Sequence, residues 1–385
     1  MPILSPSSPR PLYLQVADYL RRQIDTGVWP PEAQLPPELE LAAQLEVSRG
    51  TVRQAMQLMV NQGLLQRMAG KGTFVTRPEA RPRSQLVGMV VPYLRDSLTT
   101  EILRGVDSTL RRSTYSLVFG HSEGDLELER MQIDRLLQQG VSGLILFPVG
   151  AEGEATLLAN LLPPRFPLTI IDRRLPGLSA DTVVVDNVGG AYRAVEHLLA
   201  LGHERIACIA TRGRPSTVVD RIAGYEQALR DAGILPLAAV ALSRRQGRSG
   251  DGTPTYTPED LVPVDQLLSA RDAPTALFCV NDFIALGVMQ HVLAQGRRVP
   301  QDLAIVGFDD IAMAAHMSLP LTTVAQPKYE IGAQAAQMLI DQIAGVARPG
   351  REVVLPTSLV VRASSGAPGS PGQASSPAEA GGGES

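Results

Sequence analysis

The sequence predicts an α/β protein in which a small, mainly helical N-terminal part precedes a large part built of two lobes with parallel sheets. Up to about residue 76, apolar residues recur at intervals of three and four, which is the spacing of helices packed on a core. From residue 86 onward, continuous Val/Ile/Leu runs alternate with amphipathic stretches, a pattern typical of parallel strands covered by helices on both faces. About 275 residues with at least eight such runs exceed one comfortable sheet, so we expect two stacked α/β lobes.

The composition is that of a folded protein without a membrane span. The chain has 385 residues, of which 44% are hydrophobic and 19% charged, which excludes a disordered protein. No apolar run reaches the roughly 20 residues of a membrane helix, and the start lacks the apolar stretch of a signal peptide. We therefore expect a cytoplasmic protein.

Positive charge is concentrated near the N-terminus. The net charge of the whole chain is -4, but residues 1–83 carry 10 Lys/Arg against 7 Asp/Glu. Within residues 46–83 the count is 7 basic to 2 acidic, so this part favours an anionic partner.

The sequence contains no pattern for a metal, a cofactor or a catalytic nucleophile. Cys208 and Cys279 lie in strand-like apolar runs, which predicts reduced thiols in a core. The five histidines lack metal-ligand spacing, and we expect no metal and no cofactor. A pyridoxal phosphate enzyme would need a Schiff-base lysine, and the whole chain offers only Lys71 and Lys328.

The first elements are three helices and a hairpin. Helical patterns cover residues 12–25, 38–46 and 51–62, and glycines follow the first and third. Residues 64–76 then read as two short strands around the turn of Gly70, Lys71 and Gly72.

The third helix has one apolar face and one polar stripe. Val52, Met56 and Met59 share the face that we expect to pack inward. Arg49 and Arg53 lie one turn apart on the opposite face. A lone basic stripe is more often a solvated face, but a short turn, a basic helix and a glycine-lysine hairpin in this order indicate a winged helix-turn-helix that binds DNA.

These residues resemble the DNA-binding domain of the GntR family of bacterial transcription regulators. The stretches PLYLQVADYLRRQIDTGVW, QLPPELELAAQLEVSRGTVRQAM and GLLQRMAGKGTFV match its signature in order. Pro37 stands where the family usually has a capping Ser or Thr, Leu39 replaces a common arginine, and Glu32 replaces a common glycine. The resemblance implies that the DNA-binding residues are Ser48, Arg49, Thr51, Arg53, Gly70, Lys71 and Gly72.

Composition suggests the domain boundaries. A short charged stretch punctuated by proline follows the hairpin and reads as a linker, and the Ser/Pro/Gly/Ala-rich end reads as a disordered tail. We expect a DNA-binding domain at 1–76, a linker at 77–85, an effector-binding and dimerisation domain at 86–362 and a tail at 363–385.

The large part alternates strands and helices in order. The helices that separate most strands are expected at 99–112, 126–140, 189–202, 221–233 and 282–296. The strands are expected at 86–93, 116–121, 143–149, 168–172, 182–187, 205–210, 275–280 and 303–310.

Polar residues close two of these strands. Asp172, Arg173 and Arg174 follow one, and Asn281 and Asp282 follow another. Ligands of parallel sheets bind outside the carboxyl ends of strands, and such side chains suit the hydroxyl groups of a sugar. An aspartate there is more often a helix N-cap, a role that can coexist with binding for Asp282.

This part resembles the sensor domain of LacI/GalR-type repressors and the periplasmic sugar-binding proteins. Stretches such as VSGLILFP, VVVDNVGGAYRAVEHLLALGHERIACIA and VPQDLAIVGFDDI match in order over roughly residues 86–345. Leu98 and Thr99 stand where many relatives place an aromatic residue against the sugar, and Arg221 could alternatively be an ordinary exposed helix arginine. The resemblance implies an effector site formed by Asp172, Arg173, Arg221, Asn281, Asp282 and Gln326.

Together the two parts predict a sequence-specific transcription regulator, most simply a repressor. We expect a homodimer on double-stranded operator DNA, controlled by a small sugar-like effector between the lobes. An activator or dual regulator of the same architecture and a sugar-binding transport component are the alternatives, and the second would need export. We do not expect an enzyme.

Overall fold

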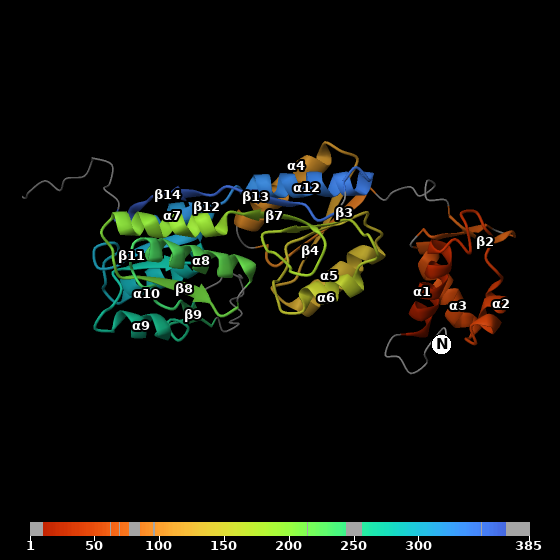
Figure 1. Ribbon diagram of the computed structural model, residues 1–385, viewed down its shortest axis with the longest axis horizontal. Coiled ribbons are helices and arrows are strands. Elements are labelled where there is room, and N and C mark those ends of the chain that lie inside the picture. The colour runs from red at the N-terminus through yellow and green to blue at the C-terminus, as the bar shows by residue number, and fades with distance from the viewer. Residues whose placement is uncertain are drawn as a thin grey trace, which may run out of the picture. The chain divides into compact units, whose positions relative to one another are not determined.

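The computed structural model of the chain (Figure 1) divides into two compact units, Met1–Leu86 with Asp134–Ser142, and Val87–Ile133 with Gly143–Ser385. We call residues 11–76 the head and residues 86–366 the sensor. The residues described are 11–61, 63–68, 70–76, 85–94, 97–213, 215–243, 256–347 and 349–366.

The head contains three helices and an antiparallel hairpin in which Leu65 pairs with Val75. The expected inward face of the third helix is confirmed, because Val52, Met56 and Met59 are all buried in the core of the head. The elements are α1 (Leu12–Asp25), α2 (Glu38–Gln44), α3 (Arg49–Asn61), β1 (Leu65–Met68) and β2 (Gly72–Val75).

The turn that leads into α2 departs from good local geometry at two positions. Glu32 has a φ of 69°, in the left-handed region that favours glycine. Pro37 is the N-cap of α2 and supplies no side-chain hydrogen bond, as the sequence predicts. Glu38 and Glu40 in the first turn complement the positive end of the helix dipole instead.

The first lobe of the sensor is a six-stranded sheet in the order β13-β7-β6-β5-β3-β4. Helices α4 (Ser97–Arg111) and α12 (Lys328–Ala344) cover one face, and α5 (Leu126–Gln138) and α6 (Glu154–Leu161) cover the other (Figure 1). Its strands are β3 (Leu86–Val91), β4 (Ser116–His121), β5 (Leu144–Leu146), β6 (Leu168–Ile171), β7 (Asp181–Val185) and β13 (Glu352–Leu355).

The second lobe repeats this plan with the order β14-β12-β11-β10-β8-β9, and only the β12–β14 pair is antiparallel. Its strands are β8 (Ile206–Thr211), β9 (Val240–Leu242), β10 (Ala276–Cys279), β11 (Ala304–Asp309), β12 (Thr322–Ala325) and β14 (Ser358–Val360). Its helices are α7 (Asn187–Ala200), α8 (Ser216–Asp231), α9 (Val262–Leu268), α10 (Asp282–Ala294) and α11 (Ala312–His316), with a 3-10 turn at Ala363–Ser365.

The chain crosses between the lobes three times. The crossings follow β7 at Asp186, β12 at Gln326–Pro327 and β13 at Pro356–Thr357. Each lobe therefore contains strands from distant parts of the sequence, and all eight expected strands are present. The predicted α/β fold with two parallel-sheet lobes is confirmed.

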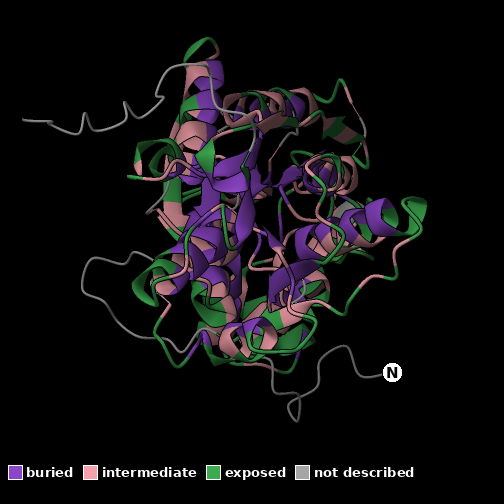
Figure 2. Ribbon diagram, turned by 90° about the vertical axis from the view of Figure 1, so that its left-hand side faces the viewer, coloured by how far each residue is buried: buried purple, intermediate pink, exposed green. Residues whose placement is uncertain are grey.

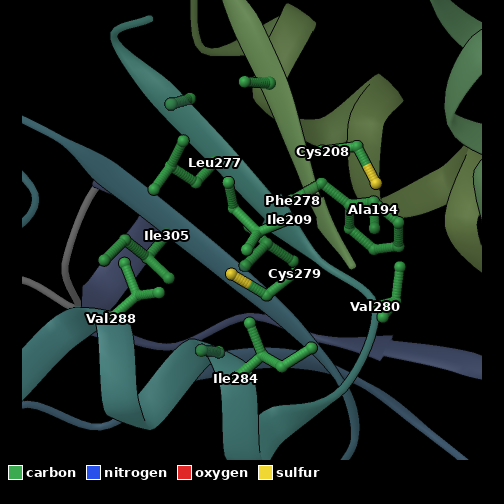
Figure 3. Packing of buried hydrophobic residues seen from close by; sticks show 14 of the residues in the cluster. Ala194, Cys208, Ile209, Leu277, Phe278, Cys279, Val280, Ile284, Val288 and Ile305 are labelled. Carbon is green, nitrogen blue, oxygen red and sulfur yellow. The ribbon is translucent and has the colours of Figure 1, made fainter. Parts of the chain in front are cut away.

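Continuous apolar strands give each lobe its own core. Figure 2 shows the buried residues running along the sheets, while exposed residues lie on the outer helix surfaces. In the second lobe Phe278 pairs in register with Cys208, and Cys279 pairs with Ile209 (Figure 3). Both cysteines are free and buried, as predicted, and burial raises the pKa of each thiol.

Two glycines allow α4 and α12 to cross closely. A Cβ atom on Gly105 would lie 2.0 Å from the carbonyl oxygen of Tyr329, and one on Gly332 would lie 2.0 Å from that of Ile102. No side chain fits at either position unless the two helices move apart.

The prediction that a disordered tail begins at residue 363 is wrong for residues 363–366. The Ser364 hydroxyl donates to the carbonyl of Ile305 (2.6 Å), and Ser365 lies 2.8 Å from the Thr322 hydroxyl. These buried polar contacts fix the segment to β11 and β12, whereas composition alone suggested solvation. The linker at 77–84 and the tail from 367 lie outside the described residues.

Helices of the described residues are too short or too polar to cross a membrane. The same residues contain no group of three or more His, Cys, Asp and Glu side chains placed to hold a metal ion.

Candidate DNA interface and effector cleft

The start of α3 is fixed by two hydroxyl residues of the predicted DNA interface. The backbone N–H of Thr51 donates to the Ser48 Oγ (3.1 Å), and the two hydroxyls lie 2.8 Å apart. Ser48 therefore caps the helix and leaves the adjacent residues on its exposed first turn.

A single carboxylate, Glu38 of α2, gathers three arginines of the head. Arg49 and Arg53 both donate from Nε to its Oε2 atom, at 3.3 Å and 3.1 Å. Arg67 of β1 donates to Oε1 at 3.3 Å. Burial alone would raise the pKa of Glu38, but Arg53, Arg49 and Arg67 outweigh it and hold the pKa below its ordinary value.

The structure thereby brings the two predicted arginines together with two residues that the sequence analysis missed. Glu38 and Arg67 are 29 positions apart, so their contact depends on how β1 lies against the helices. The arginine side chains remain 61%, 55% and 41% exposed for Arg49, Arg53 and Arg67, which leaves them accessible to a phosphate or a base edge.

The turn between β1 and β2 needs its glycines. Gly70 and Gly72 have φ values of 73° and 120°, and a Cβ atom on Gly72 would lie 2.6 Å from Nε2 of Gln34. Gln34 donates to the carbonyl of Lys71 (2.9 Å), which holds the turn while the Lys71 side chain stays exposed. The turn can therefore present a cation and bare backbone to an anionic chain.

Arg221 on α8 is the centre of a buried polar group in the second lobe. Its guanidinium donates to the Asn187 Oδ1 (2.8 Å) and the Val280 carbonyl (2.6 Å) and lies 3.0 Å from Oδ1 of Asp309. It also stacks 3.7 Å above the ring of Phe308. Arg221 is 5% exposed, so the interpretation as an ordinary surface arginine is wrong.

Asp309, which ends β11, was missed by the sequence analysis. Gln326 donates to its Oδ1 atom at 2.6 Å, so Arg221, Asp309 and Gln326 form one cluster. The Oε1 atom of Gln326 is buried without a hydrogen-bond partner among the described residues, and Gln326 lines a hollow of about 270 Å³. The rule that polar residues close apolar strands could have found Asp309 in the run LAIVGFDD.

Asn281 and Asp282 hold the backbone around this cluster. Asn281 caps α10 by accepting the Ile284 N–H (2.9 Å), so the N-cap is Asn281 and not Asp282. Asp282 is fully buried and accepts from the Ile311 N–H (2.9 Å) and the Thr323 hydroxyl (2.5 Å). Burial and the neighbouring Asp309 raise the pKa of Asp282 well above its ordinary value.

Asp172 and Arg173 belong to the first lobe, where they follow β6. Asp172 is buried with a φ of 67°, and its Oδ2 atom lies 3.6 Å from Nε of Arg173. The Arg173 guanidinium lies 5.3 Å from the centre of the Phe147 ring and donates to the carbonyls of Pro148 and Val149. Leu98 and Thr99 are buried in α4, with Leu98 in the core of the lobe.

A bridge between the lobes lies next to both groups. The backbone N–H of Arg174 donates to the Ser216 hydroxyl (2.8 Å), and its side chain pairs with Asp220 (2.8 Å). Arg174 follows Arg173, and Asp220 precedes Arg221, so the bridge places the two candidate groups on facing lobes.

Comparison with known proteins agrees with both parts. The pattern of "Bacterial regulatory proteins, gntR family" matches residues 12–75, and that of "Periplasmic binding protein-like domain" matches residues 195–365. The arabinose metabolism transcriptional repressor of Geobacillus stearothermophilus is 32% identical over 341 residues, which cover 86% of this chain and 91% of that protein.

Solved structures share the fold of the sensor. A LacI family regulator from Enterococcus faecium with bound ribose has a TM-score of 0.59 and 26% identity, covering 72% of this chain and 98% of that one. The lac repressor dimer bound to operator has a TM-score of 0.62 and 26% identity, covering 74% and 96%. The chain thus belongs to the bacterial transcriptional repressors that include the arabinose metabolism repressor, in which a GntR-type DNA-binding head is joined to a LacI-type sensor.

Proposed function

We propose that the chain is a repressor that binds operator DNA as a homodimer and is controlled by a small sugar-like effector held between its lobes. The observation that carries this proposal is the buried cluster of Arg221, Asp309 and Gln326 beside the bridge between the lobes. It combines paired donors with acceptors, and neighbouring sugar hydroxyls need both.

The relatives support the class of effector and the oligomeric state. One relative is named for arabinose metabolism, another holds ribose, and the lac repressor is a dimer on its operator. We propose that Asp172 and Arg173 contact the effector from the first lobe and that Arg221 and Asp309 do so from the second. Gln326 would bind through its Oε1 atom, while Asn281 and Asp282 would act by holding the backbone.

We propose that operator contacts come from the first turn of α3 and from the hairpin turn. Arg49 and Arg53 would read or clamp the major groove, with Ser48 and Thr51 beside them and the 70–72 turn on the sugar-phosphate chain. The head would comprise residues 1–76 and the sensor residues from 86 onward, joined by the linker. A chain with this task acts where operator DNA is, in the cytoplasm, and binds rather than turns over its effector.

Thermal unfolding in the presence of sugars tests this function. Arabinose, ribose and their phosphates are added one at a time, and DNA selected from a random pool by the chain serves as operator. We expect one of these ligands to raise the Tm of the sensor and to lower operator affinity. A ligand that binds one lobe arrangement more tightly shifts the sensor toward it, and this shift changes the equilibrium of operator binding. Failure of every ligand to change either quantity would contradict the proposal.

A further inference from the structure

Two buried carboxyl groups lie beside the first-lobe half of the effector site without a role so far. Glu129 belongs to α5 and Glu154 to α6, and both are 0% exposed. Carboxyl groups rarely occupy such positions unless each oxygen has a partner.

Both groups accept hydrogen bonds from the loop that follows β5. Glu129 accepts from the Val149 N–H (2.9 Å) through Oε2. Glu154 accepts from the N–H groups of Gly150 (2.7 Å) and Ala151 (2.9 Å), also through Oε2. Three consecutive backbone donors are thus taken up by two side chains.

The second oxygen of each group has no such partner. Oε1 of Glu129 and Oε1 of Glu154 are buried and make no hydrogen bond with any atom whose position is described. The two side chains hold neighbouring N–H groups of one loop, and burial together with Glu154 raises the pKa of Glu129 to about 9. A proton on one oxygen would satisfy both, because the protonated carboxyl donates and the carboxylate accepts.

The same loop also contacts Arg173, through its backbone carbonyl groups. The carbonyls of Pro148 and Val149 accept from the Arg173 guanidinium, and Arg173 in turn pairs with Asp172. Arg173 is also the cation that acts on Glu129 and opposes the pKa shift. Glu129 and Glu154 are therefore connected to the candidate effector residues Arg173 and Asp172 by the backbone of residues 148–151.

We infer that Glu129 and Glu154 share one proton and together are positioning residues that hold the 148–151 loop, and through it Arg173 and Asp172, in place for the effector. This inference rests on the proposed function only for the effector. The shared proton is argued from two buried, unpartnered carboxyl oxygens on side chains that hold the same loop, and it can be tested without any ligand.

The proton is tested by the pH dependence of unfolding. Because the folded pKa of Glu129 is raised, its stabilisation is complete below the ordinary value near 4.5 and falls as pH rises toward about 9. In Glu129→Gln the side-chain amide can donate a hydrogen bond to Glu154 at every pH, because it has no proton that dissociates in this range. We expect the unfolding equilibrium constant of the wild type, divided by that of Glu129→Gln, to rise about tenfold per pH unit between pH 5.5 and 8.5.

Glu127→Gln on the same helix is the matched control, because Glu127 is exposed and pairs with Arg130. Its ratio to the wild type should stay constant over this range. A wild type and a Glu129→Gln variant with parallel pH dependence would overturn the shared proton.

Positioning is tested with whichever of arabinose and ribose stabilises the wild type. Glu129→Gln should bind that sugar within about twofold of the wild type, because the amide can still accept from Val149 and donate to Glu154. Glu129→Ala should weaken sugar binding at least about tenfold while operator affinity without sugar is kept. Equal sugar affinity of Glu129→Ala and the wild type would overturn the positioning role. If neither sugar binds the wild type, the proposed effector class fails while the pH measurement still judges the pair.

Discussion

At the scale of single residues, buried charges decide how the proposed effector site is built. Asp309 is the counter-ion of Arg221, and both side chains are almost fully buried, so removing the carboxylate would leave a buried cation without its counter-ion. Gln326 adds an amide donor to the same carboxylate. The site is therefore a set of mutually dependent groups and not a row of separate contacts.

Replacing Asp309 by Asn should lower both stability and effector binding. The change leaves the guanidinium of Arg221 buried without its carboxylate, and we expect a loss of about 3 kcal/mol in the free energy of unfolding. The rise in Tm caused by arabinose or ribose should disappear. Asp302→Asn is the control, because Asp302 is an exposed partner of Arg298, and a similar loss there would point to general instability.

We expect Glu38 to limit how freely Arg49, Arg53 and Arg67 can contact DNA, because it pairs with all three. Its removal in Glu38→Ala releases Arg49, Arg53 and Arg67 and removes one negative charge from the surface that they share. Affinity for a non-operator duplex should rise, and its salt dependence should steepen by about one unit of log–log slope. Stability should change by less than about 1 kcal/mol, because these pairs are exposed.

Glu40→Ala provides the comparison for Glu38→Ala, since Glu40 lies on the same helix and bonds Gln44. Binding titrations between 50 and 200 mM salt separate the two variants, because a slope difference of about one unit changes their relative affinity about fourfold over this range. Identical salt slopes for both would show that Glu38 does not restrain the arginines.

At the scale of elements, the first lobe depends on how closely two helices cross. Gly105 of α4 and Gly332 of α12 each face the backbone of the other helix. The contact cannot be relieved by turning a side chain, because the opposing atoms are carbonyl oxygens.

Gly332→Ala should therefore destabilise the sensor by about 2–3 kcal/mol, although alanine is the better helix former. Gly213→Ala is the matched change, because a Cβ atom there meets nothing within 4 Å. Chemical unfolding of both variants measures the difference. A Gly332→Ala sensor as stable as the wild type would mean that the helices separate at no cost.

Elements with a strong local pattern could be predicted from the sequence, and contacts between distant elements could not. Seven of the eight expected strands are buried apolar runs, and β4 is the half-exposed exception. The strands β13 and β14 are also short and half exposed, and β13 joins its sheet by pairing with β7. Asp172 could be predicted from its position at the end of a strand, and Arg221 from the resemblance to LacI/GalR-type sensors. Glu38 and Arg67 belong to different elements, and so do Glu129 and Glu154. The spacing of residues along the chain therefore does not predict that they act together.

At the scale of the whole sensor, Arg174 connects the two lobes. It pairs with Asp220 of the second lobe at 2.8 Å and with Glu352 of the first at 2.9 Å. Opening of the lobes would break the pair of Arg174 with Asp220 and would leave its pair with Glu352 intact. In the proposed function, effector binding and lobe arrangement are linked through such contacts.

Asp220→Asn should weaken the bridge between the lobes and reduce effector affinity about two- to fivefold, which is on the order of 0.5–1 kcal/mol for a partly exposed pair. Glu352→Gln removes the pair within the first lobe and should leave effector affinity unchanged. Titration calorimetry of both variants with the stabilising sugar makes the comparison. A larger effect of Glu352→Gln would assign the role to the arrangement of the first lobe instead.

The burial of Cys208 and Cys279 has a practical consequence for watching these motions. They are the only two cysteines of the chain, and both thiols lie in the core of the second lobe with a raised pKa. A spin label or dye that reacts with thiolates will leave them untouched in the folded protein. One cysteine introduced at exposed Met131 and another at exposed Leu235 would then form a spectroscopic ruler across the two lobes, with no background from the native chain.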